Sequence, residues 1–71
     1  MTPGDIYIRL QRSGWKVNGN ADGLYFFRRR RRVFMNPHDP VWIDLTMDSD
    51  GNLFAGRGNA GAKIRTEDAL K

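Results

Sequence analysis

The fold class is decided by the segment Val41–Met47, which reads VWIDLTM. Every second residue from Val41 to Met47 is apolar, and Trp42, Asp44 and Thr46 fill the positions between them. Successive residues of a strand point to opposite faces of a sheet, so this period of two predicts a half-buried β-strand. A strand of this kind needs partners on both sides and a hydrophobic element over its apolar face.

The N-terminal segment predicts that covering element, a helix over residues 3–13. Thr2 and Asp5 form a T-x-x-D capping pattern around a proline at the first helical position. Ile6 and Leu10 then lie one helical turn apart on a single apolar stripe, with Gly14 as the stop signal. These apolar residues also alternate as in a strand, but the capping pattern favours the helix.

The rest of the chain supplies the partner strands and turns. We expect strands at residues 15–17, 24–27, 33–35 and 53–55, separated by turns or loops at residues 18–23, 36–40 and 48–52. The hairpin dipeptide within the first turn is Asn18-Gly19. Thr66 is the best candidate to cap a short helical turn near the C-terminus.

Together these signals predict an α+β fold in one small domain, residues 1–71. An N-terminal helix packs on an antiparallel sheet of three to four strands. A short loose C-terminal segment follows, and residues 55–71 are expected to be rich in loops or mobile because Gly56, Gly58 and Gly61 interrupt them. Seventy-one residues lie near the lower size at which one hydrophobic core suffices.

Charge is distributed unevenly along the chain. Residues 1–36 hold eight basic and two acidic side chains, whereas residues 37–71 hold four basic and six acidic ones. The formal net charge is +4. Such a polarised chain attracts polyanions to one region and repels them from another.

The strongest functional signal is the run of five arginines, Arg28, Arg29, Arg30, Arg31 and Arg32. An unpaired arginine in the core would be very costly, and strand residues alternate between faces. The run must therefore lie at a strand end, at an edge, or in a protruding hairpin. Arginine offers a bidentate fork to phosphate, and each phosphate that it neutralises releases counterions. The alternative interpretation is a solvated edge strand whose charges prevent aggregation.

Further basic residues extend this site. Arg9 and Arg12 lie three apart on the polar side of the expected helix, and Lys16 follows it. They either flank the arginine run or form an ordinary polar face. Arg57 and Lys63, in and after the glycine-rich loop, are a secondary possibility for contact with a phosphate backbone.

Catalytic and metal-binding patterns fail on spacing or composition. Gly56, Gly58 and Gly61 spell G-x-G-x-x-G, but no βαβ unit fits around them. The acids at Asp48 and Asp50 lack the remaining ligands of a calcium loop. The chain has no cysteine and a single histidine, His38. We therefore expect no enzyme activity, no metal and no cofactor.

The sequence thus predicts a small nucleic-acid-binding protein that contacts the phosphate backbone of DNA or RNA through its arginine run. The rival hypothesis is a protein-interaction module, such as a small inhibitor or accessory factor, that docks on an acidic or nucleic-acid-binding surface of a larger complex. No apolar run approaches membrane-spanning length, and the first residues lack a signal-peptide pattern. We expect a soluble cytoplasmic protein, or a nuclear one in a eukaryote, with no membrane partner.

Overall fold

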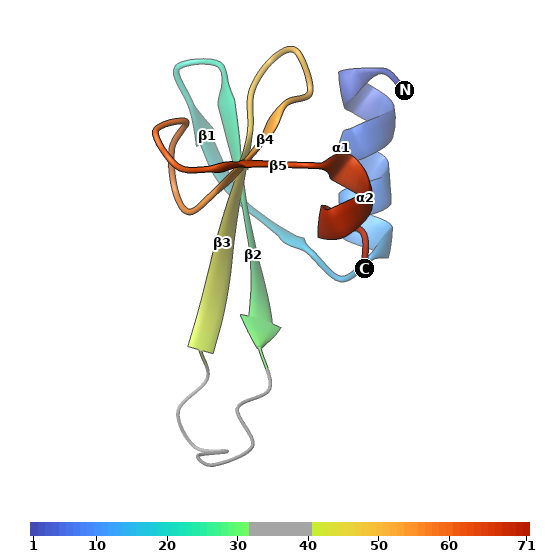
Figure 1. The fold of residues 1–71 in the computed structure, drawn as a ribbon, viewed down its shortest axis with the longest axis vertical. Helices are drawn as coiled ribbons and strands as arrows, with labels where there is room; N and C mark the ends of the chain where they lie inside the picture. The colour runs from blue at the N-terminus through green and yellow to red at the C-terminus, as the bar shows by residue number, and fades with distance from the viewer. Residues whose placement is uncertain (32–40) are drawn as a thin grey trace.

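A helix and an antiparallel sheet form the core of the computed structural model, which describes residues 1–31 and 41–71 (Figure 1). Within these residues the elements are α1 (Pro3–Arg12), β1 (Lys16–Ala21), β2 (Leu24–Arg31), β3 (Val41–Met47), β4 (Leu53–Ala55), β5 (Lys63–Ile64) and α2 (Thr66–Ala69). The sheet is a meander in the order β1-β2-β3-β4-β5, and each neighbouring pair is antiparallel. The predicted α+β fold is confirmed.

The start of α1 follows the capping pattern of the sequence. The Thr2 hydroxyl accepts a hydrogen bond from the Asp5 amide at 3.2 Å, and the Asp5 carboxylate accepts one from the Thr2 amide at 3.1 Å. These two bonds satisfy amides that the first turn of a helix leaves unpaired. The helix ends at Arg12 with Ser13 as its C-cap, one residue from the expected end.

The core lies between α1 and one face of the sheet. Ile6 and Leu10 are buried against the sheet, whereas Ile8 is 49% exposed, as a helix requires and a strand would not. Tyr7 adds edge-to-face contacts with Tyr25 and Phe27, at ring-centroid distances of 5.8 and 5.4 Å. The other buried hydrophobic residues of the core are Trp15, Leu45, Met47, Leu53 and Ala69.

The first hairpin turns later than the sequence suggests. The turn that joins β1 to β2 is Asp22-Gly23, where both residues have positive φ (53° and 77°), as in a two-residue type I′ turn. The predicted dipeptide Asn18-Gly19 instead lies inside β1, where the register shifts between Val17 and Asn20. The prediction was wrong because a glycine with positive φ serves a β-bulge as readily as a turn.

The C-terminal segment is more ordered than expected. It adds the short strand β5 and the helix α2, which is tied to the core because Trp15 Nε1 donates a buried hydrogen bond to the Ala69 carbonyl at 2.8 Å. Thr66 is not the cap: it is the first helical residue, and Arg65 occupies the N-cap position with no side-chain capping bond. Arg65 instead pairs with Glu67 and Asp68.

β2 and β3 extend beyond the rest of the sheet as a two-stranded ribbon (Figure 1). β1 pairs with β2 only as far as Arg28, and β4 pairs with β3 only from Leu45 onward. The predictions for Arg32, for the strand at 33–35, and for the loop at 36–40 with His38 fall outside the described residues.

Candidate nucleic-acid interface

The alternation of β2 divides the arginine run between two faces of the sheet. Residues directly opposite each other on neighbouring strands share a face. Phe27 and Arg29 pair with Leu45 and Ile43, so both belong to the face that α1 covers. Arg28 and Arg30 have the opposite parity, and they belong to the face that the helices leave open.

Arg29 is engaged in the fold. Its guanidinium lies over the ring of Trp15 at 4.5 Å from the centroid, and its Nη1 donates a hydrogen bond to the main-chain oxygen of Lys71 at 3.0 Å. A cation over an indole face is held by the ring quadrupole. Arg29 thus joins the ribbon to the end of α1 and to the C-terminal segment, although the sequence placed it only in the binding run.

Three cross-strand rows make up the open face. One row joins Arg30 to Trp42, and the next joins Lys16, Arg28 and Asp44. A third row joins Phe26, Thr46, Phe54 and Lys63. We call the residues of these rows, together with Arg57, the open face. Its aromatic and basic residues come from all five strands and one loop.

Two arginine–aromatic pairs lie on this open face. Arg28 covers the ring of Trp42 at 4.3 Å from the centroid, and Arg57 covers the ring of Phe26 at 4.7 Å. Trp42 remains 40% exposed, whereas Phe26 is 8% exposed. A guanidinium that stacks through its plane keeps its N–H donors along its edge, where an oxyanion can accept them.

The position of Arg57 depends on a buried threonine. The Thr46 hydroxyl is fully buried; it donates to the Gly56 carbonyl and accepts from the Gly58 amide, both at 2.8 Å. These two bonds hold the loop on either side of Arg57 against β3. The sequence pattern predicted only a secondary role for this arginine, because its contact with Phe26 joins segments far apart in the chain.

Positive charge dominates the open face. Asp44 is the one acid in the three rows, and no ion pair to Arg28, Arg30 or Lys16 forms among the residues that the structure describes. The Nε of Arg28 is buried without a hydrogen-bond partner. Because this nitrogen is buried, a ligand does not reach it in this conformation, and contact with an anion falls to the terminal nitrogens of Arg28.

The acids with shifted pKa values serve turns and caps rather than this face. A hydrogen bond from Asn52 lowers the pKa of Asp48, a bond from the Thr2 backbone lowers the pKa of Asp5, and a bond from Arg65 lowers the pKa of Asp68. Asp48 also accepts from the Asp50 amide, which makes the segment a turn. No cluster of possible metal ligands occurs within residues 1–31 and 41–71.

Arg9 and Arg12 do not join the open face. Both are exposed on α1, which covers the opposite face of the sheet. The backbone of Arg31 pairs with that of Val41 at the end of the described part of β2. Of the predicted site residues within the described ranges, the structure therefore brings together Lys16, Arg28 and Arg30.

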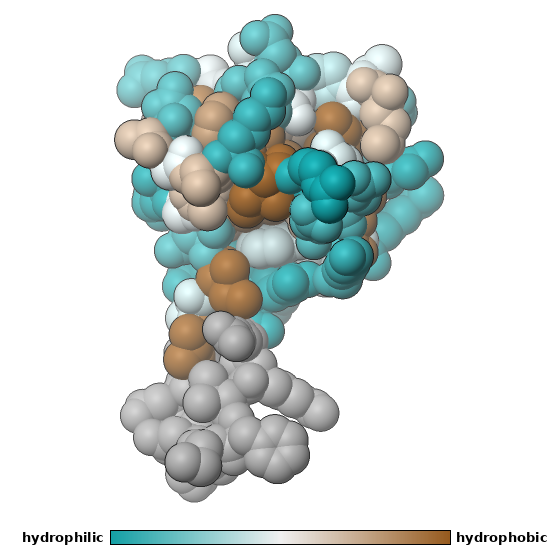
Figure 2. All heavy atoms as spheres, viewed as in Figure 1, coloured by the Kyte–Doolittle hydropathy of each residue, from teal (hydrophilic) through white to brown (hydrophobic). Residues whose placement is uncertain are grey.

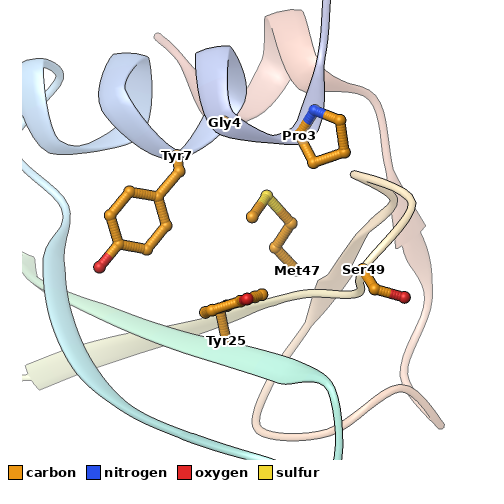
Figure 3. A pocket seen from close by; sticks show the side chains of 6 residues that line it. All are labelled: Pro3, Gly4, Tyr7, Tyr25, Met47 and Ser49. Atoms are coloured by element: carbon orange, nitrogen blue, oxygen red, sulfur yellow. The ribbon is translucent and has the colours of Figure 1, made fainter.

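A separate hollow of about 320 Å³ lies between the start of α1 and the sheet (Figure 3). Its walls are uncharged: they are Pro3, Gly4, Tyr7, Tyr25, Met47 and Ser49. The two tyrosine rings stand edge to face, which leaves an apolar wall. This hollow offers nothing to an anion, so it is distinct from the open face.

Comparison of the chain with protein-family models, with curated proteins and with solved structures finds no match. In the described part of the chain, neither helix has the length and apolar character needed to cross a membrane. Function must therefore be argued from the open face itself.

Proposed function

We propose that this protein binds nucleic acid, with Lys16, Arg28 and Arg30 of the open face contacting the phosphate backbone. One observation carries the proposal: strand alternation and register gather these cations on a face with a single acid, Asp44. Phosphate contacts at such a face release counterions, which favours a polyanion over an isolated anion. Arg57 and Lys63 extend the same positive surface across the sheet.

The test measures how affinity depends on salt. Labelled single-stranded and duplex oligonucleotides of about 16 nucleotides, the upper range of single-domain site sizes, are titrated with the protein by fluorescence anisotropy. If four phosphates of a single strand are neutralised, affinity should fall roughly fifty-fold between about 50 and 200 mM salt. Absence of binding at low salt would refute the proposal.

A matched pair of double variants tests the face. Arg28→Gln with Arg30→Gln should make the logarithmic salt slope shallower by about 1.4 for a single strand. Arg9→Gln with Arg12→Gln removes the same charge from α1, on the other side of the sheet. At about 0.15 M salt, where charges more than roughly 8 Å apart are screened, this control should leave affinity nearly unchanged. Equal losses in both variants would contradict the assignment of the site.

A competitor separates nucleic acid from an acidic protein partner. Polyglutamate presents carboxylates at high density but lacks phosphates and bases. It should displace the labelled oligonucleotide only weakly at equal charge concentration, because arginine forks fit phosphate well and stack on bases. Displacement as efficient as that by unlabelled oligonucleotide would favour the protein-interaction alternative.

A further inference from the structure

Trp42 is the residue of the open face that a phosphate-binding site does not require. It occupies one of the β3 positions that alternate with the core-facing residues. It lies opposite Arg30 and is 40% exposed. The second tryptophan, Trp15, is buried in the core at 4% exposed. A large aromatic ring on an open sheet face adds nothing to phosphate contacts, but it offers a flat surface to a nucleobase.

Arg28 contacts the indole ring of Trp42 and helps to hold it in place. The Arg28 guanidinium lies 4.3 Å from the centroid of the Trp42 ring. The guanidinium covers one side of the ring, and a base can stack on an indole ring as it can on an arginine plane. The terminal N–H donors of Arg28 remain for the adjoining phosphates, whereas its Nε is buried.

We propose that the open face takes single-stranded nucleic acid, with one base stacked on Trp42 and the adjoining phosphates held by Arg28 and Arg30. This inference rests on the proposed function and names its ligand. A duplex could satisfy the cations, but its bases are stacked on one another and paired, so none is available to the indole. Only an unpaired strand uses both the aromatic and the basic residues of the face.

The layout of the ribbon supports this choice. Trp42 lies on the projecting part of the β2–β3 ribbon, beyond the last pair of β3 with β4. Figure 2 shows strongly hydrophobic residues, in brown, at the surface where the ribbon leaves the sheet; tryptophan is not coloured brown on this scale, so they mark an uncovered ribbon and not the indole itself. The Arg57–Phe26 pair repeats the arginine–aromatic arrangement further along the same face. Charge complementarity and interleaved aromatic rings are the combination that sequence-tolerant single-strand binding uses.

The experiment compares an unpaired strand of about 16 nucleotides with its own duplex at one salt concentration. Trp42→Ala should weaken single-strand binding by about 5- to 150-fold, the range for one stacked base. It should leave duplex binding within about twofold, since phosphate contacts remain. Trp42→Phe should retain most of the affinity. Val41→Ala is the matched control, because Val41 is similarly exposed (44%) but has the opposite parity on the same strand.

Tryptophan emission gives an independent measurement. Binding of the single strand should quench the emission of the native protein, and this quenching should be lost in Trp42→Phe, which retains only the buried Trp15. If the single strand and the duplex bind equally and Trp42→Ala affects both alike, the stacking site is refuted while the proposed function stands. If neither oligonucleotide binds at low salt, both proposals fail.

Discussion

Two adjacent arginines of β2 are expected to have opposite roles. Arg29 lies on the helix-covered face, where it contacts the Trp15 ring and the main-chain oxygen of Lys71. Arg30 lies on the open face and is exposed. Substituting each with threonine removes the same charge and keeps a residue that strands favour. Arg29→Thr should therefore reduce stability, whereas Arg30→Thr should reduce binding.

The structure sets the size of each effect. A partly exposed cation–π contact is worth about 0.5–1 kcal/mol. The hydrogen bond to Lys71 is exposed and adds only about 0.5–1 kcal/mol, which brings the loss in Arg29→Thr to about 1–2 kcal/mol. In a domain of this size, that lowers the melting temperature by about 4–16 °C. Arg30 is exposed, so the change in stability of Arg30→Thr should stay within about 0.5 kcal/mol.

Binding reverses the order of the two variants. Loss of one phosphate contact in Arg30→Thr should make the logarithmic salt slope for a single strand shallower by about 0.7. Arg29→Thr should leave that slope unchanged at temperatures well below its melting point. The assays are thermal melting followed by circular dichroism and anisotropy titrations over a salt series. Equal melting temperatures in the two variants, or equal changes of slope, would refute the division of the run between two faces.

Three further changes test the fold that presents the site. Trp15→Phe leaves the Ala69 carbonyl without its buried donor and should lower the free energy of unfolding by about 1–3 kcal/mol, measured by urea denaturation. Gly61→Ala drives its Cβ into the Ala55 carbonyl oxygen, so the Ala55 amide, which donates to Ala62, should lose protection from hydrogen exchange. The lowered pKa of Asp48 contributes stability that is present above the ordinary aspartate pKa and lost as pH falls through the lowered value. Asp48→Asn should therefore flatten the fall of the urea midpoint between about pH 5 and pH 2.

Local sequence signals predicted the elements whose stabilising bonds are local. The cap of α1 joins residues three apart, and the alternation of β3 is visible within its own segment. β5 and α2 were harder to predict, because they depend on pairing with β4 and on the bond from Trp15 to Ala69, which spans most of the chain. Thr66 had good capping chemistry, but α2 begins at Thr66 itself and Arg65 occupies the N-cap position.

Candidate site residues divide in the same way. Alternation alone shows that consecutive arginines must point to different faces of the sheet. It does not show which of the two alternating sets lies on the face that the helix covers. That choice follows from the pairing of Phe27 with Leu45 in the core. The exposure of Trp42 could have been predicted, since it occupies a position between the apolar, alternating residues of a regular strand. The contact of Arg57 with Phe26 was not, because the Thr46 hydroxyl bonds fix it across the fold.

Edge protection remains the competing explanation for the arginine run, and the shape of the sheet argues against it. Over most of the sheet within the described ranges, the edge strands are β1 and β5; β1 is bulged and β5 is two residues long, features that by themselves discourage pairing with another chain. On the projecting ribbon both strands lose their outer neighbours. There β2 carries arginines, while β3 carries Val41 and Trp42, which are 44% and 40% exposed.

Protection of the ribbon against aggregation would need charge on both open edges, and above all on the apolar one. The positive charges instead stand on one strand, and the other strand offers Asp44 and the exposed Trp42. The arginine run also begins where the core ends. Phe27 is fully buried, and the next β2 residue on the same face of the sheet is Arg29. At Arg29 the guanidinium is held at the rim of the core by Trp15 and the Lys71 main-chain oxygen, so an arginine at this position is tolerable. A ribbon that combines cations with an uncovered indole is therefore better explained by a ligand that uses both than by the avoidance of neighbours.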